Sequence, residues 1–100
     1  MFVHSMNQSK KYYLICYDIE STKKRTKLAK TLETFGIRVQ KSVFEAFLDE
    51  DFVTEMVEAI TPYVSEQDTV RIYELSKRAY NNKMVIGTLF DYIPQDDIII

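Results

Sequence analysis

YYLICYDI, residues 12–19, is an almost unbroken run of aromatic, β-branched and other apolar side chains. Its length and composition are typical of a strand that is buried on both sides of a sheet. Successive side chains of a strand point to opposite faces, and here both alternating sets are apolar. One set is Tyr13, Ile15 and Tyr17, and the other is Tyr12, Leu14 and Cys16. We therefore expect helices to cover one face of the sheet and a second copy of the chain to cover the other.

The residues after this strand predict two amphipathic helices, separated by a further strand. Ser21 or Thr22 can cap the start of the first helix, and Gly36 follows where a helix usually stops. The apolar stripe of the first helix consists of Leu28, Ala29, Leu32 and Phe35. Three acidic residues at 49–51 open the second helix, where negative charge suits the helix dipole. The stripe of the second helix consists of Phe52, Val53, Met56, Val57 and Ile60.

Three further strands are expected at residues 39–48, 69–75 and 83–87, the last after a polar turn around Asn81 and Asn82. This order of strands and helices, on fewer than about ninety residues, fits an α+β fold. The specific prediction is a ferredoxin-like sandwich of the βαββαβ type, in which two helices cover one face of an antiparallel sheet.

The ends of the chain are expected to lie outside this domain. Residues 1–10 read as a flexible leader, residues 11–88 as the ferredoxin-like domain, and residues 89–100 as a C-terminal extension. The extension ends in Ile98–Ile100, which would be an aggregation hazard if it were left exposed. We expect it to form an extra strand on a partner subunit, and a disordered tail is the alternative.

The composition indicates one globular domain with an uneven charge distribution. With 46% hydrophobic residues, a single cysteine and no long apolar segment, the chain is expected to be cytoplasmic, without a disulfide or a membrane partner. Residues 1–41 hold nine basic and three acidic side chains, a net charge of +6, whereas residues 42–100 carry −8. This asymmetry favours one face for a polyanion, and two oppositely charged, solvated helix faces are the alternative.

Asp18 is out of place at the end of the apolar strand. A carboxylate in such surroundings is costly unless it is solvated, paired or bound to a cation. It could simply meet water or cap the next helix. The functional interpretation is a divalent-metal site for Mg²⁺ or Mn²⁺, to which a symmetric dimer could bring two copies of Asp18. A metal ion at such a site can activate water for phosphodiester cleavage.

Other polar residues near this strand end are candidates for phosphate chemistry. Arg25, in the first turn of the helix, is expected to point towards Asp18, either to pair with it or to receive a phosphate. Arg38 and Ser42 are further candidates, and Phe44 is expected in the core rather than as a base-stacking platform. The sequence has no Cys/His cluster for zinc, no glycine-rich phosphate loop and no nucleophilic triad.

Several motifs, in the same order and spacing, resemble those of the CRISPR-associated Cas-two proteins. The motifs are Y-D-I at 17–19, K-K-R-T-K-L at 23–28, F-G-I-R-V-Q-K-S-V-F-E at 35–45, D-T-V-R-I-Y at 68–73 and M-V-I-G at 84–87. The resemblance spans roughly residues 12–87, and the block at 35–45 is the most specific. The chain departs from the commoner pattern at Glu20, Ser21 and Thr22, where many relatives have further aspartates or an earlier basic run.

The resemblance implies a ferredoxin-like homodimer with metal-dependent endonuclease activity on RNA or DNA. It assigns the metal-binding, catalytic role to Asp18. The supporting residues that it suggests are Tyr17, Arg25, Arg38, Ser42 and Phe44. It also implies that the dimer takes part in spacer acquisition with the integrase subunit of the CRISPR system.

Three functions remain as hypotheses. The first is a Mg²⁺-dependent endonuclease of CRISPR immunity, which needs Asp18. The second is a catalytically silent DNA-binding scaffold of the spacer-acquisition complex, which needs the basic side chains of the first helix, namely Lys23, Lys24, Lys27 and Lys30. The third is a regulatory or toxin-like dimer of the same fold, unrelated to CRISPR.

Overall fold

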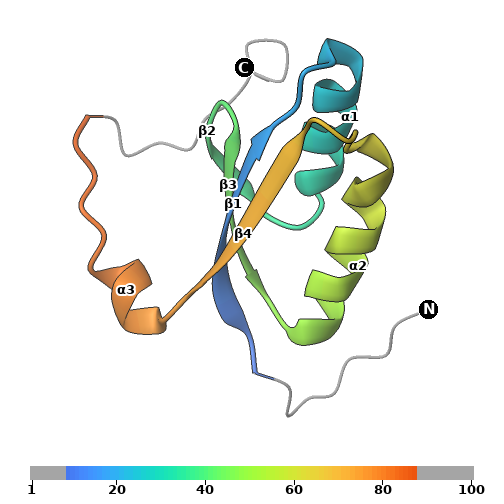
Figure 1. Cartoon of the computed structure of the whole chain (residues 1–100). Coiled ribbons are helices and arrows are strands. Elements are labelled where there is room, and N and C mark those ends of the chain that lie inside the picture. Colours follow the sequence, from blue (N-terminus) through green and yellow to red (C-terminus); the bar gives the residue numbers. More distant parts are fainter. Residues whose placement is uncertain (1–8, 88–100) are drawn as a thin grey trace, which may run out of the picture.

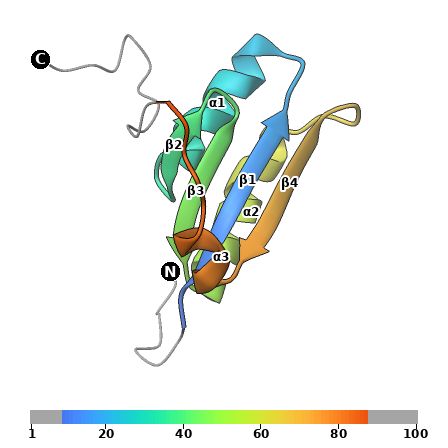
Figure 2. The ribbon, with the colours of Figure 1, turned by 90° about the vertical axis from the view of Figure 1, so that its left-hand side faces the viewer.

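The computed structural model describes residues 9–87, which form a sheet with helices on both sides. The elements are β1 (Lys11–Asp18), α1 (Thr22–Leu32), β2 (Ile37–Gln40), β3 (Val43–Leu48), α2 (Glu50–Ile60), β4 (Thr69–Leu75) and α3 (Lys77–Asn81). The strands lie in the order β2-β3-β1-β4, and each neighbouring pair is antiparallel. Helices α1 and α2 cover one face (Figure 1), and the short α3 lies over part of the other (Figure 2). The predicted ferredoxin-like α+β fold is confirmed.

Side-chain caps fix where the two long helices begin. The hydroxyl of Ser21 accepts a hydrogen bond from the Lys24 amide at 3.3 Å, and the Asp49 carboxylate accepts one from the Phe52 amide at 2.9 Å. Helix α2 ends at Ile60 and continues as a single 3₁₀ turn, Thr61–Tyr63. In the part of the chain that is described, no helix is both long and apolar enough to cross a membrane.

The hydrophobic core lies between the sheet and the two long helices. Its largest fully buried side chains are Phe44, Ile15, Leu28, Leu32 and Met56. On β1, the set that contains Ile15 and Tyr17 faces this core, whereas the alternate set faces the opposite side of the sheet and is only partly buried. We call these two sides the helix-covered face and the open face.

Gly36 allows the chain to pass close to the sheet between α1 and β2. Its amide donates to the Leu32 carbonyl at 3.0 Å, so the glycine follows the helix as predicted. Its φ is not positive, since Gly87 is the only residue with positive φ in the described range. The missing side chain matters for a different reason: a Cβ atom at Gly36 would collide with the carbonyl oxygen of Glu45 on β3.

Two of the strand predictions were wrong. Residues 39–48 do not form one strand, because a turn at Lys41 and Ser42 separates β2 from β3. Residues 83–87 lie in no strand, since no other described strand is placed beside them. The expected polar turn at Asn81 is the end of α3, whose N-terminal cap is Ser76. The sheet therefore has the predicted number of strands but different members.

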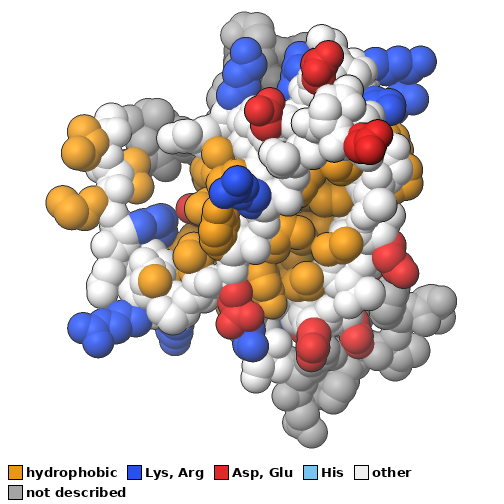
Figure 3. All heavy atoms as spheres, viewed as in Figure 1, with side chains coloured by type: hydrophobic (Ala, Val, Ile, Leu, Met, Phe, Trp, Pro, Cys, Tyr) orange, Lys and Arg blue, Asp and Glu red, His pale blue; other side chains and the backbone are white. Residues whose placement is uncertain are grey.

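The predictions for the two ends of the chain lie largely outside the described residues. These are the leader before residue 9 and the C-terminal extension, 89–100, with its extra strand and its pairing to a partner subunit. The segment 83–87 leads towards this extension, and its apolar side chains stand out from the surface (Figure 3). Met84 and Ile86 are 88% and 95% exposed.

Candidate active site

Asp18 ends β1 on the open face of the sheet. It is in register with Thr69 of β4 and, following the alternation of the strand, shares its face with Leu14 and Cys16. Its side chain is exposed and has no hydrogen-bond or ion-pair partner among residues 9–87. The strand end therefore presents a solvated carboxylate that makes no polar contact within the described part of the chain.

Tyr17 lies on the other side of the sheet from Asp18, although the two are neighbours in sequence. The Tyr17 hydroxyl donates to the carbonyl of Lys41 at 3.1 Å, and the Arg38 guanidinium donates to the same carbonyl at 3.1 and 2.7 Å. Burial raises the pKa of Tyr17, so its hydroxyl stays protonated at neutral pH. Tyr17 and Arg38 thus hold the turn between β2 and β3.

Phe44 belongs to the core, as predicted from its apolar surroundings. It is fully buried, its ring centroid lies 6.3 Å from that of Tyr17, and the Arg38 guanidinium carbon lies 5.8 Å above it. Ser42 is the second residue of the turn, and its carbonyl accepts a hydrogen bond from the backbone amide of Tyr17 at 3.1 Å. The structure therefore brings Tyr17, Arg38, Ser42 and Phe44 together, but it does not place them on the face that carries Asp18.

Arg25 does not pair with Asp18, so the ion-pair alternative was wrong. Its guanidinium donates to the carbonyl oxygens of Ile19 at 2.8 Å and Glu20 at 3.4 Å, and to the Thr22 hydroxyl at 3.1 Å. The carbonyl groups of Ile19 and Glu20, in the loop between Asp18 and Arg25, accept the hydrogen bonds of the guanidinium in place of the Asp18 carboxylate. Arg25 thus acts on the loop that follows Asp18.

The basic residues of α1 form a charged surface next to this loop. Lys23, Lys24, Lys27 and Lys30 are all exposed. The Lys24 ammonium donates to the Ser65 hydroxyl at 2.8 Å, across to the loop before β4. Figure 3 shows basic side chains at the top of the molecule, over the beginning of α1, with acidic side chains between them. This surface is suited to phosphate groups, since it places several cations on one side of one helix.

Two groups in this region were not identified from the sequence. One is the Lys41 carbonyl, which accepts hydrogen bonds from the side chains of both Tyr17 and Arg38. The other is Asp68, whose carboxylate accepts the amides of Glu20 at 3.0 Å and Ser65 at 2.8 Å. Asp68 stands directly before the predicted strand at 69–75, so a turn-forming role was open to sequence reasoning, but its bond to Glu20 spans 48 residues.

The donor set of one chain fits a divalent ion only in part. Across the described residues, no three or more His, Cys, Asp or Glu side chains lie close enough together to hold a metal ion. Mg²⁺ commonly uses one or two carboxylates together with water and phosphate oxygens. Asp18 can supply one such carboxylate, and a second copy of the chain, water and a nucleic-acid phosphate would have to supply the rest.

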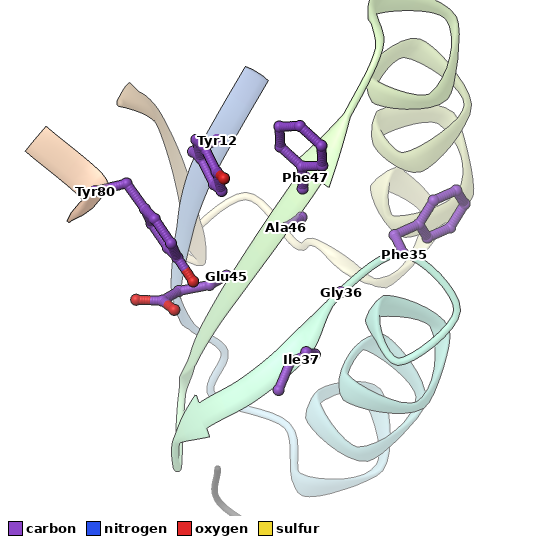
Figure 4. Close-up of a pocket in the computed structure, with 8 residues that line it drawn as sticks. All are labelled: Tyr12, Phe35, Gly36, Ile37, Glu45, Ala46, Phe47 and Tyr80. Carbon is purple, nitrogen blue, oxygen red and sulfur yellow. The ribbon is translucent and has the colours of Figure 1, made fainter. Parts of the chain in front are cut away.

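A hollow also opens on the open face, beside the edge strand. It is lined by Tyr12, Phe35, Gly36, Ile37, Glu45, Ala46, Phe47 and Tyr80. Figure 4 shows that Tyr80 of α3 and Tyr12 of β1 lie side by side, and their stacked rings are 4.0 Å apart. This aromatic corner lies towards the end of β1 opposite to Asp18, so it is separate from the candidate active site.

Comparisons with known proteins agree on one family. The model of the family described as CRISPR associated protein Cas2 matches residues 11–83. A Synechocystis protein named CRISPR-associated endoribonuclease Cas2 2 is 34% identical over 91 residues, which cover 89% of this chain and 98% of that protein.

Solved structures whose titles name Cas2 are also similar to this chain. Streptococcus pyogenes Cas2 matches with a TM-score of 0.69 and 27% identity, covering 76% of this chain and 99% of that one. A chain of a partial Cas6-RT-Cas1–Cas2 complex matches with a TM-score of 0.61 and 33% identity, covering 76% of this chain and 90% of that one.

Proposed function

The chain belongs to the CRISPR associated protein Cas2 family, and we propose that it is a metal-dependent endonuclease that acts during spacer acquisition. Its substrate would be the phosphodiester backbone of RNA or DNA, and its partner the integrase subunit. The names of the relatives support this proposal, because the Synechocystis protein is called an endoribonuclease and one structural neighbour comes from a Cas1–Cas2 complex. A dimer unrelated to CRISPR, the third hypothesis, is wrong.

The observation that carries the proposal is the solvated carboxylate of Asp18 at the end of β1. Because Asp18 lies on the open face, a symmetric dimer formed through that face could bring two copies of it towards one axis. These carboxylates would hold the divalent ion, with water and a substrate phosphate as its other ligands. When bound, the ion would activate water or stabilise the leaving oxygen.

Exposed apolar side chains support a homodimer that uses the open face. Ile37, Phe47 and Tyr73 are 54%, 49% and 45% exposed, and all three lie on this face by their strand registers. They are large side chains on β2, β3 and β4, and a second copy of the sheet would remove them from water. The same contact would cover Leu14 and Cys16, so it would explain why β1 is apolar on both faces.

Replacing Asp18 with asparagine tests the nuclease. Asp18→Asn keeps the shape of the side chain and removes the charge. We expect cleavage to fall by roughly 100-fold or more, since even the outer partners of metal ligands are worth 10–100-fold. The free energy of unfolding and the affinity for nucleic acid should be the same as in the parent protein. Rates are measured on purified protein with a range of Mg²⁺ and Mn²⁺ concentrations.

Glu66→Gln is the matched control for this test, because Glu66 is an exposed carboxylate in a turn with no partner in the described part of the structure. It should cut as fast as the parent. Equal rates for the parent and Asp18→Asn would mean that the nuclease lies elsewhere or is a contaminant, and the scaffold function would then be favoured.

The scaffold remains the second candidate, because a specific observation favours it. The four lysines of α1 are exposed, whereas the described residues of one chain hold no cluster of three or more potential metal ligands. A scaffold would bind nucleic acid through this helix and Arg38, position it for the integrase subunit, and need no metal.

Charge reversal on α1 tests this binding surface. In the variant with Lys23, Lys24, Lys27 and Lys30 all changed to Glu, the affinity should fall for every nucleic-acid sequence. The plot of log affinity against log salt concentration should become less steep by up to about 3 to 4, because each lost phosphate contact contributes about 0.9 to the magnitude of its slope. Titrations at several salt concentrations measure both. Lys77→Glu with Arg78→Glu on α3 is the control, and equal losses in both variants would move the binding face away from α1.

A further inference from the structure

The loop that joins Asp18 to α1 is held from two sides by residues outside it. This loop consists of Ile19, Glu20 and Ser21. Ile19 is buried in the core, whereas Glu20 and Ser21 are exposed. Glu20 and Ser21 bury no apolar side chain, so the conformation of this exposed part of the loop depends on its polar contacts.

Asp68 supplies one of these contacts. Its Oδ1 accepts the Glu20 amide at 3.0 Å, and its Oδ2 accepts the Ser65 amide at 2.8 Å. One carboxylate therefore links the β1–α1 loop to the loop that precedes β4. The two amide donors lower the pKa of Asp68, so that it is ionised at neutral pH and both oxygens act as acceptors.

Arg25 and Lys24 complete the link from the side of α1. Arg25 donates to the carbonyl of Glu20, so the backbone amide of that residue is bound by Asp68 and its carbonyl by Arg25. The Lys24 ammonium donates to the Ser65 hydroxyl at 2.8 Å, which connects the first turn of α1 to the same distant loop. The loop is thus fixed at both polar groups of one residue.

This link lies beside the candidate catalytic carboxylate. Asp18 is in register with Thr69, the residue next to Asp68 in sequence. Only Ile19 separates Asp18 from Glu20, so a shift of the Glu20 backbone would be transmitted to the end of β1. A displacement of about 1 Å at a reacting group can cost 100-fold in rate, even when its cause lies outside the site.

We infer that Asp68 is a positioning residue of the active site, which fixes the β1–α1 loop and thereby holds Asp18 in place at the end of β1. The inference rests on the proposed nuclease function. Asp68 does not touch substrate in this role. It orders the backbone after Asp18, and Arg25 acts as its counterpart on the carbonyl side of the same loop.

The test compares Asp68→Ala, which removes both acceptors, with Asp68→Asn, which keeps one acceptor oxygen. Glu66→Ala is the matched control, since it removes a carboxylate from the same loop without breaking any contact between described residues. The loop is monitored through the exchange rate of the Glu20 amide by NMR on the full chain. The site is monitored through kcat and KM for metal-dependent cleavage.

In Asp68→Ala we expect the Glu20 amide to exchange at least about tenfold faster than in the parent. We expect kcat to fall at least about tenfold while KM stays within about twofold, because an interaction that positions a catalytic group is expressed in the transition state. Asp68→Asn should be intermediate in both measurements, and Glu66→Ala should match the parent. The intermediate variant keeps the test valid if the alanine variant folds poorly.

Unchanged exchange of the Glu20 amide in both Asp68 variants would overturn the inference, because the loop would then be held by other groups. Faster exchange with an unchanged kcat would overturn it as well, since Asp68 would then be a structural link only. A parent protein without cleavage activity would overturn the proposed function and the positioning role together. An active parent with unaffected Asp68 variants would overturn the positioning role alone.

Discussion

Phe44 and Phe47 show how differently the two faces of the sheet are built. Both are on β3, three residues apart, and they point to opposite sides. Phe44 is fully buried beneath the helices, whereas Phe47 is 49% exposed on the open face and contacts Tyr12 at a ring distance of 4.5 Å. The same type of side chain therefore fills the core on one face and remains in contact with water on the other.

The difference arises from what each face has to cover it. On one side, the buried residues of α1 and α2 meet the sheet: Leu28, Ala29, Leu32, Met56 and Ile60. On the other side, α3 has five residues and none of them is buried. The helices of one chain thus bury only the helix-covered face of the sheet. A large apolar area that stays exposed, as on the open face, is typical of a surface that binds another molecule.

The largest expected effect is on the helix-covered face. Phe44→Ala should lower the free energy of unfolding by about 3–5 kcal/mol, because it leaves a cavity in a packed core. Phe47→Ala should cost only about 1 kcal/mol within one chain, the value of an aromatic pair. Urea unfolding at several protein concentrations separates the stability of the chain from any dimer. Similar losses at low concentration would contradict the distinction between the two faces.

A smaller effect is expected on association. Phe47→Asp puts a charge on the open face. We expect it to raise the dissociation constant of the dimer at least about tenfold, the loss that is typical when an energetically important interface residue is replaced. Sedimentation equilibrium measures this. Val57→Asp is the matched control, because Val57 is 40% exposed but lies on α2. A monomeric parent, or equal weakening by both variants, would show that the open face is not the dimer interface.

The smallest effect concerns Tyr17, at the end of the helix-covered face. Tyr17→Phe removes one hydrogen bond to the Lys41 carbonyl, which Arg38 still occupies, so we expect a loss of about 1 kcal/mol at neutral pH. Burial raises the pKa of Tyr17 in the folded state. The pKa of tyrosine in the unfolded chain is about 10. The stabilising contribution of the Tyr17 hydroxyl is therefore complete below about pH 10 and is lost as the pH rises above that value towards the folded-state pKa.

Chemical denaturation between neutral and alkaline pH measures this contribution. The parent should lose stability above about pH 10, and Tyr17→Phe should lose less. Tyr13 also has a pKa raised by burial, so part of the alkaline decrease should remain in the variant and disappear in Tyr13→Phe. An identical alkaline decrease in the parent and in Tyr17→Phe would mean that the Tyr17 hydroxyl is not protected.

Several elements were predictable because their signals are local. The apolar run at 12–19 corresponds to β1. Ser21, one of the two expected caps, starts α1, and α2 begins within the acidic stretch at 49–51 as expected. The split of residues 39–48 into two strands was hard to predict, because the turn at Lys41 and Ser42 contains no glycine, proline or asparagine, and serine is only a weak turn signal. The strand predicted at 83–87 failed, because β-rich composition forms a strand only where a neighbouring strand is available.

The candidate site divides in the same way. A carboxylate at the end of an apolar strand was recognisable from composition, and the structure places Asp18 at that strand end, exposed. The expected contact of Arg25 with Asp18 was wrong, since backbone carbonyl groups of the intervening loop satisfy the guanidinium. Tyr17 and Asp18 are adjacent in sequence and yet lie on opposite faces, which follows from the two-residue period of a strand.

By itself the sequence determined the family, the α+β fold class, the two helices with their apolar stripes and the carboxylate at the end of the first strand. These depend on periodicity, caps and composition, which act over a few residues. Only the tertiary structure decided which face of the sheet the helices cover, how Arg25 is used, and that Asp68 binds a loop 48 residues away. Such contacts form when distant segments pack together, and no local pattern specifies them.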